Sequence, residues 1–372
     1  MKRNILAALL ALTSVFAGAQ EKKVPWINNV KFSGYGMLQY QYSGKENAKA
    51  NTFNIRFARF SLSGRIAKDF FWLAQIQVNG NTSTLTASPR IVDLYAEWQK
   101  YDFFRVKLGQ FKNPFTFESP MNPIDQGFMG YGQAVLKLSG FSDRDGRINS
   151  NGRDIGLQVQ GDFLKNASGR NLLHYQVGVF NGQGINLADV DQQKNLIGGI
   201  WVMPVKGMRI GAFGWTGSYA RKGTSEAEGI TSKTLRSLQE RRYAFSAEYV
   251  VDDWTFRSEY IHSTGLAFAK TLEDTKGETA NDITLSADGD KAQGVYALVI
   301  APIIKKKMHI KGRYDMYQPT GDASKQKTQY EIALDYYFHP HFSISGEYAF
   351  INDRSLQKHN YSLVDVQVSY RF

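Results

Sequence analysis

Residues 361–372, at the end of the chain, read YSLVDVQVSYRF and alternate between two kinds of side chain. Successive side chains of a β-strand point to opposite faces, so the alternation separates an apolar face from a polar one. The apolar face carries Ser362, Val364, Val366, Val368, Tyr370 and Phe372, and the polar face carries Leu363, Asp365, Gln367, Ser369 and Arg371. This stretch therefore predicts a strand that lies between two different surroundings.

The same alternation recurs along the chain in segments of about ten residues, separated by turn-type residues. A soluble β-sandwich would also alternate, with its apolar face as the core, so the period alone does not decide between sandwich and barrel. The pattern predicts about sixteen strands, at 30–43, 53–66, 69–79, 90–99, 102–110, 153–161, 171–180, 194–203, 208–216, 241–251, 254–262, 291–301, 306–316, 328–338, 341–350 and 360–372.

The connections between these strands favour the barrel. They alternate between short turns, such as Asp252-Asp253, and long segments, such as 111–152. Short turns at one rim and long loops at the other are typical of outer-membrane barrels. Aromatic residues also gather near strand ends, as Tyr40 and Tyr42 do, where interfacial girdles place them. We therefore expect an all-β fold, a transmembrane antiparallel barrel formed by residues 30–372, with both termini on the periplasmic side.

The composition excludes several classes of protein. The 372 residues include 45 Lys and Arg against 34 Asp and Glu, a formal net charge of +11, and no cysteine. Without cysteine there is no disulfide framework and no thiolate metal site. The mean hydropathy is −0.37, and no unbroken apolar run reaches the roughly 18 residues that a transmembrane helix needs.

The first residues have the features of a secretory signal peptide. Lys2 and Arg3 precede the apolar stretch 5–16, and Ala17-Gly18-Ala19 resembles a cleavage site. The sequence thus predicts a signal peptide at 1–19, followed by a periplasmic N-terminal segment at 20–29. The positive charge would otherwise suggest a nucleic-acid partner, but export to the bacterial outer membrane argues against one. We expect outer-membrane lipid to surround the barrel.

The chain end also resembles the C-terminal assembly signature of bacterial outer-membrane proteins. Tyr370-Arg371-Phe372 are the matching residues, and they close a strand with hydrophobic residues at every second position. The resemblance implies that Tyr370 and Phe372 are an assembly signal for the barrel-assembly machinery.

Residues 111–152 form the longest connection, and loops of this length are usually functional or disordered. Three prolines, at positions 114, 120 and 123, and several apolar residues indicate a packed loop. We expect this third external loop to fold into the lumen, which side chains of the wall alone cannot fill, and to narrow the pore. Its charged residues are balanced: Lys112, Lys137, Arg144 and Arg147 stand against Glu118, Asp125, Asp143 and Asp145.

The polar faces of the strands define a predicted inner wall. Counted along the strands, its charge is close to neutral, which would orient dipolar solutes rather than exclude one sign of charge. Any single charged residue there can also be merely solvated. The candidate pore-lining residues are Arg59, Arg65, Arg105, Lys107, Arg257, Lys311, Arg313, Asp93 and Glu97.

Four short motifs, taken in order, resemble the phosphate-selective porin O and P family. They are Val106-Lys107-Leu108-Gly109-Gln110-Phe111-Lys112-Asn113-Pro114-Phe115, Phe57-Ala58-Arg59-Phe60-Ser61-Leu62-Ser63-Gly64, Arg153-Asp154-Ile155-Gly156 and Val177-Gly178-Val179-Phe180-Asn181-Gly182. The resemblance covers about residues 30–372 and implies a sixteen-stranded porin, commonly a homotrimer, for small anions such as phosphate or other hydrophilic solutes. Members selective for phosphate carry an arginine ladder, and this sequence shows no dense one.

Catalysis has little support in the sequence. The six histidines are scattered, no common catalytic or nucleotide-binding motif occurs, and no cofactor or metal site is expected. The leading interpretation is a passive diffusion channel. The alternative is a barrel whose external loops at 217–240 and 263–290 bind a surface partner, with little or no transport.

Overall fold

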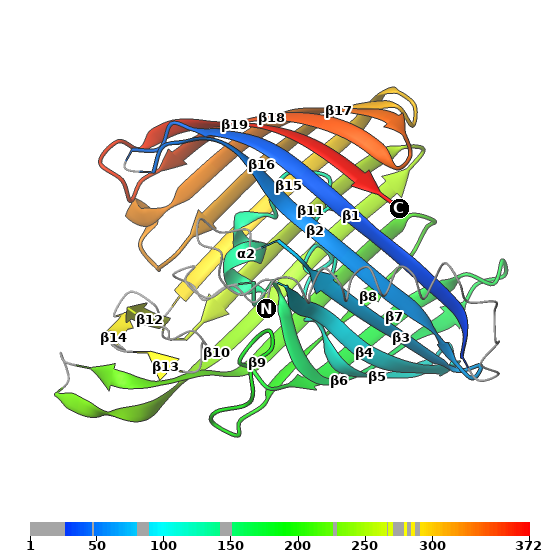
Figure 1. The fold of residues 1–372 in the computed structure, drawn as a ribbon, viewed down its shortest axis with the longest axis horizontal. Coiled ribbons are helices and arrows are strands. Elements are labelled where there is room, and N and C mark those ends of the chain that lie inside the picture. Colours follow the sequence, from blue (N-terminus) through cyan, green and yellow to red (C-terminus); the bar gives the residue numbers. More distant parts are fainter. Residues whose placement is uncertain are drawn as a thin grey trace, which may run out of the picture.

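The computed structural model describes residues 27–46, 48–79, 89–141, 151–225, 229–265, 267–270, 279–280, 284–286 and 291–372. They form a closed antiparallel barrel whose strands run diagonally around a central space (Figure 1). The main sheet has seventeen strands, and without the two-residue β13 (Thr279–Ala280) sixteen strands build the barrel. The predicted all-β antiparallel barrel and its strand number are therefore confirmed.

The barrel strands agree in order with the sixteen expected segments. They are β1 (Ile27–Ser43), β2 (Ala50–Ile66), β3 (Phe70–Gln77), β4 (Arg90–Tyr101), β5 (Phe104–Lys112), β6 (Arg153–Lys165), β7 (Asn171–Phe180), β8 (Asn195–Val202), β9 (Met208–Ser225), β10 (Ile230–Val251), β11 (Trp254–Thr264), β15 (Lys291–Ile304), β16 (Met308–Gln318), β17 (Lys327–His339), β18 (Phe342–Asp353) and β19 (Asn360–Arg371).

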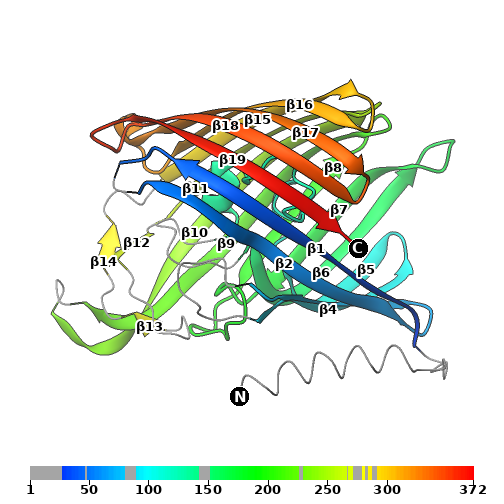
Figure 2. The ribbon, with the colours of Figure 1, turned by 45° about the horizontal axis from the view of Figure 1, so that its top comes forward.

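The first and last strands close the barrel. β1 pairs with β19 in antiparallel register from Tyr35 opposite Arg371 to Ser43 opposite Leu363, and the two strands lie side by side in Figures 1 and 2. Closure pairs the edges that an open sheet would leave free, which the lipid environment demands because no water reaches those backbone groups.

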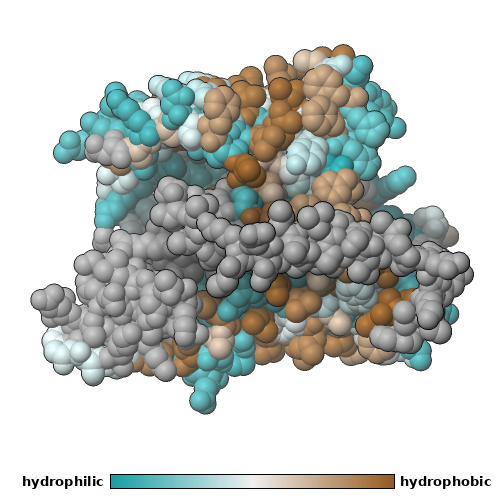
Figure 3. Space-filling model, viewed as in Figure 1, coloured by the Kyte–Doolittle hydropathy of each residue, from teal (hydrophilic) through white to brown (hydrophobic). Residues whose placement is uncertain are grey.

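Apolar side chains cover the outside of the barrel. Phe32, Ile332 and Leu334 are about half exposed, and their inward-pointing strand neighbours Ala333 and Asp335 are buried. On the face seen in Figure 3, the strands around β19 carry a hydrophobic band between hydrophilic ends. The charged face of the alternation is thus the inner wall.

Two strands extend farther than the sequence predicts. β9 and β10 continue as a paired hairpin through most of 217–240, which was expected to be a loop. This hairpin projects beyond the barrel (Figure 1). Neither of its faces needs to be apolar there, so the sequence of the hairpin lacks the alternation of apolar and polar residues. At the other end, β1 begins at Ile27, inside the segment expected at 20–29.

Helical structure is sparse in the described residues. It comprises α2 (Gln133–Leu138) and the 3-10 helix η2 (Ala323–Lys325), and no described helix is long and apolar enough to cross a membrane. α2 lies within the barrel (Figures 1 and 2). A small separate sheet pairs β12 (Ala267–Lys270) with β14 (Thr284–Ser286). Residues 1–19, predicted as the signal peptide, and most of 263–290 lie outside the described residues.

The hydrophobic core lies inside the barrel. Residues 113–141, here called the lumen segment, supply Phe115, Phe117, Phe128, Tyr131, Val135, Leu138 and Phe141 to it. Wall residues of β5, β7 to β11 and β15 to β17, among them Phe213 and Trp215, supply the rest. Phe117 meets Phe213 and Trp201 edge to face, with ring centroids 5.4 and 5.6 Å apart. The apolar side chains of the lumen segment are therefore packed against the inner wall, and Ile124 makes a further contact with Tyr35, Met37 and Phe57.

Candidate functional site

Charged wall residues hold the lumen segment by its backbone. Glu259 on β11 accepts hydrogen bonds from the amides of Phe117 and Glu118, with N···O distances of 2.6 and 2.9 Å. Glu347 on β18 accepts one from the amide of Met129 at 2.9 Å. Asp315 on β16 accepts one from Gln133 at 2.8 Å.

Basic residues of the same strands bind the carbonyls of the segment. Arg257 donates to the carbonyl of Gln126 (3.1 Å), Arg313 to that of Gly130 (2.8 Å), and Lys311 to that of Gly127. Each of these cations also has a carboxylate partner: Glu248 for Arg257, Glu331 for Arg313 and Asp335 for Lys311. The structure thus places three of the predicted pore-lining cations in anchoring contacts with the lumen segment.

A second group of basic residues lies on the other side of the lumen, on β2, β4, β5 and β6. We call it the basic strip. Its members are Arg56, Arg59, Arg90, Lys107, Lys112 and Arg153. These strands also carry four carboxylates, Asp93, Glu97, Asp154 and Asp162, of which Asp93 pairs with Arg153 and Asp162 with Arg105.

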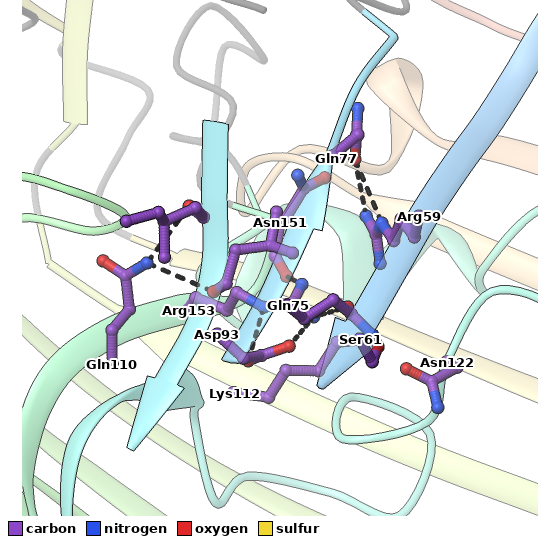
Figure 4. Close-up of polar contacts among 12 residues, drawn as sticks. Arg59, Ser61, Gln75, Gln77, Asp93, Gln110, Lys112, Asn122, Asn151 and Arg153 are labelled. Carbon is purple, nitrogen blue, oxygen red and sulfur yellow. Dashed lines mark hydrogen bonds and ion pairs between the residues drawn. The ribbon is translucent and has the colours of Figure 1, made fainter. Parts of the chain in front are cut away.

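Arg59 and Arg153 are almost fully buried and are held by polar neighbours (Figure 4). The Arg59 guanidinium donates to Gln77 Oε1 at 3.1 and 2.9 Å and to the Tyr35 hydroxyl at 2.9 Å. Arg153 makes a bidentate ion pair with Asp93, with N···O distances of 2.8 and 2.7 Å. Such a fork is geometrically specific and stronger than a neutral hydrogen bond.

Lys112 is held by the lumen segment itself. Its ammonium donates to the carbonyls of Ser119 and Met121 and to the Tyr131 hydroxyl, so its three protons are all engaged. It also lies over the Tyr131 ring, 4.9 Å from the centroid. Lys112, predicted for the loop, therefore ties the end of β5 to the segment that follows it.

The remaining predicted wall residues lie toward the short turns. Arg65 donates to the Lys68 carbonyl (3.3 Å) and to Gln99 (3.1 Å). Arg105 pairs with Asp162 at 2.6 Å. Both cations are thus engaged away from the lumen segment.

The predicted loop residues have different surroundings. Glu118 is fully buried and accepts a hydrogen bond from the Gly132 amide at 3.2 Å, and burial raises the pKa of Glu118 to about 7. Asp125 pairs with Arg371 at 2.9 Å. Lys137 is half-buried on α2. Arg144 and Arg147 lie outside the described residues.

Two residues of the wall, Arg56 and Val92, depart from the simple alternation because of β-bulges. Arg56 is the extra residue where the register with β1 shifts, between Phe57 and Ile55, and it reaches inward to Gln367 at 2.9 Å. The two-residue period of β4 would place Val92 on the outer face with Leu94, but Val92 is fully buried because the register of β4 shifts beside it. A bulge adds one residue to a strand and reverses the faces beyond it, which period counting misses.

Arg56, Arg90, Tyr35 and Gln77 were not among the residues predicted for the site. In the sequence these residues are recognisable only as polar or aromatic positions within a predicted strand. Arg56 and Arg59 are three positions apart, and a two-residue period assigns residues at that spacing to opposite faces. Arg90 lies near enough to interact electrostatically with Arg59 and Arg153. The strip is thus assembled from four strands of the N-terminal half of the chain, between positions 56 and 153.

A family model for Gram-negative porins matches residues 6–356 of the chain. No curated protein matches it significantly by sequence.

Several solved outer-membrane proteins have a similar fold. The anion-selective porin from Comamonas acidovorans is 12% identical, with a TM-score of 0.64, covering 92% of this chain and 99% of that chain. OprB from Pseudomonas putida is 11% identical (TM-score 0.60; 96% and 97% covered), and in-vitro folded OmpT of Vibrio cholerae is 10% identical (TM-score 0.60; 95% and 100% covered). At these identities the likeness establishes the fold.

Proposed function

Because the chain belongs to the Gram-negative porin family, we propose that this multi-pass barrel of the outer membrane is a passive diffusion channel for small hydrophilic solutes and prefers anions. Solutes move down their gradients through the lumen, and the diameter and the charge of the narrowest part set the selectivity. In this proposal the lumen segment is the constriction, and no cofactor takes part.

One observation carries the anion preference. The basic strip gathers six cations, and of the four carboxylates on its strands two are already paired with arginines, Asp93 with Arg153 and Asp162 with Arg105. The cations of the opposite wall are engaged by carboxylates and by the lumen segment. A cavity of about 220 Å³ lies between the strip and the segment, lined by Lys107, Lys112 and Arg153. A solute in this space meets a positive wall, which raises the local concentration of anions.

The reversal potential in a salt gradient tests the preference. Purified protein in a planar bilayer should show discrete conductance steps, and Arg59→Gln should move the anion-to-cation permeability ratio toward one. Arg354→Gln removes the same charge from an exposed loop and should leave the ratio unchanged. A bilayer without conductance steps would contradict the channel, and an unchanged ratio in Arg59→Gln would contradict the role of the strip.

Phosphate is the finer proposal, and the motifs shared with the phosphate-selective porin O and P family support it. A comparison of chloride with phosphate as the permeant anion tests it separately. Equal permeability of the two anions, relative to the same cation, would leave a general anion channel.

The further properties of the family are proposals as well. We propose removal of the signal peptide at 1–19, recognition of Tyr370 and Phe372 by the barrel-assembly machinery, and assembly as a homotrimer. One OmpT structure of Vibrio cholerae with this fold is described as a trimer form. Native mass spectrometry of the mature protein measures both the cleavage site and the oligomeric state.

The projecting β9–β10 hairpin favours a second candidate function, binding of a surface partner. Its strands pair well beyond the barrel, with Leu238 opposite Tyr219 and Thr234 opposite Gly223. Replacing 218–237 by a two-residue turn should leave conductance unchanged if the hairpin serves a partner. A loss of conductance would instead assign the hairpin to the channel.

A further inference from the structure

A hollow in the basic strip lies around Gly109 on β5. Gly109 has a φ of 135°, and a Cβ there would lie 2.2 Å from the carbonyl oxygen of Leu94, so the position requires glycine. The bare backbone separates Lys107 from Phe111, and Tyr95 lies opposite on β4. Lys107, Phe111 and Tyr95 line the cavity of about 220 Å³ together with Leu73 and others.

The ammonium group of Lys107 faces this hollow and has no hydrogen-bonded partner among the described residues. Its ammonium lies 5.0 Å from the Tyr95 ring centroid and 5.1 Å from that of Phe111. Glu97 is directly opposite on β4, but its carboxylate accepts hydrogen bonds from Gln99 and Gln160. Among the described residues no ion pair or hydrogen bond engages the Lys107 ammonium.

The other two cations of the hollow are occupied. The three protons of Lys112 bind two carbonyls and a hydroxyl, and Arg153 holds Asp93 in a bidentate ion pair. They contribute positive potential, but only Lys107 has donors free for a ligand.

We propose that this hollow, the Lys107 pocket, is a binding subsite for a small organic carboxylate that carries a flat apolar group. The carboxylate accepts from the Lys107 ammonium, and the apolar group lies against Leu73 and the rings of Tyr95 and Phe111. Passage of phosphate through the channel does not require binding in this pocket, and inorganic phosphate fits the pocket less well, because its oxygens need several donors and the pocket offers one free cation beside apolar surface. This inference rests on the proposed channel function, since the solute reaches the pocket through the lumen.

Equilibrium binding of benzoate to the folded, detergent-solubilised barrel tests the pocket. Lys107→Met should weaken benzoate binding about tenfold, as expected for loss of one charge-assisted hydrogen bond. Lys107→Arg keeps the charge and should retain binding. Lys31→Met removes an exposed lysine of β1 outside the pocket and is the matched control, expected to bind as the unaltered protein does. Circular dichroism verifies that each variant is folded.

Competition identifies the ligand class. Benzoate should bind more tightly than acetate, which lacks the ring, and more tightly than inorganic phosphate or the uncharged benzyl alcohol. The proposal is overturned if Lys107→Met binds benzoate normally, if Lys31→Met loses as much affinity, or if phosphate or benzyl alcohol binds as tightly as benzoate. Missing conductance steps would contradict the channel alone, because the binding measurement needs no current.

Discussion

Gly34 and Phe372 exchange two backbone hydrogen bonds across the seam where the barrel closes, with N···O distances of 3.0 and 3.1 Å. The Phe372 ring lies close above Gly34 and meets Phe32 and Phe60, with centroids 5.7 and 5.9 Å apart. A Cβ at position 34 would come within 2.6 Å of that ring and of the Arg59 carbonyl oxygen. The predicted assembly residue Phe372 therefore occupies space that a glycine leaves open.

Gly34→Val should destabilise the closed barrel, because the added side chain must displace both a ring and a backbone carbonyl. The expected loss is about 1–3 kcal/mol, the usual cost of overpacking. Thermal unfolding followed by circular dichroism measures it. Gly346→Val is the control, since a Cβ at Gly346 meets nothing within 4 Å; equal unfolding temperatures of the two variants would refute the role of the seam.

Arg153→Met should be strongly destabilising, since it leaves the buried carboxylate of Asp93 without its partner. Removing one member of a buried ion pair costs about 3–5 kcal/mol. Guanidinium unfolding of the single variant and of Arg153→Met/Asp93→Leu provides the comparison. The double variant should recover most of the loss, and a double variant as unstable as the single one would show that the ion pair is not the cause.

Glu259→Ala should loosen the lumen segment, because it removes the acceptor for the amides of Phe117 and Glu118. A hydrogen bond to a charged group contributes about 1.5–3 kcal/mol. The expected result is larger and noisier conductance steps. Glu46→Ala, at an exposed position, should leave the steps unchanged; identical steps in Glu259→Ala would mean that the segment does not limit the pore.

The carboxyl of Glu118 predicts a pH dependence of stability. Burial raises its pKa from 4.5 to about 7, so between these values the folded protein binds more protons than the unfolded chain. The contribution of this group to stability therefore falls as the pH rises through that window and is constant above it.

Unfolding temperatures at pH 5 and pH 8 measure this contribution. Glu118→Gln should reduce the difference between them, whereas Glu46→Gln should not. A difference that survives intact in Glu118→Gln would assign the pH dependence to other groups.

The sequence predicted the barrel because a strand between lipid and a polar interior needs a two-residue period, and this requirement acts locally. The apolar face of the last strand, with Val364, Val366 and Val368, can be assigned from its own residues without knowledge of any other strand. The same logic failed at Val92 and Arg56, where a single inserted residue changes the face. It also failed in the β9–β10 hairpin, where neither face of the pairing is required to be apolar.

The distribution of charged side chains around the inner wall could not be predicted from the sequence. Counting along the strands gave an almost neutral wall, and the structure separates a basic strip from a side where Arg257, Lys311 and Arg313 anchor the lumen segment. Which cation has a free hydrogen-bond donor depends on partners far away in the chain, as for Arg313 and Gly130.

By itself the sequence determined the strands, their number and the faces toward lipid, since these follow from the alternation of neighbouring residues. That Lys112 is fully engaged while Lys107 is not follows from the folded arrangement alone. The partners of Lys112 lie on the lumen segment, and which of its groups reach Lys112 depends on how that segment folds inside the barrel, which the alternation of neighbouring residues does not encode.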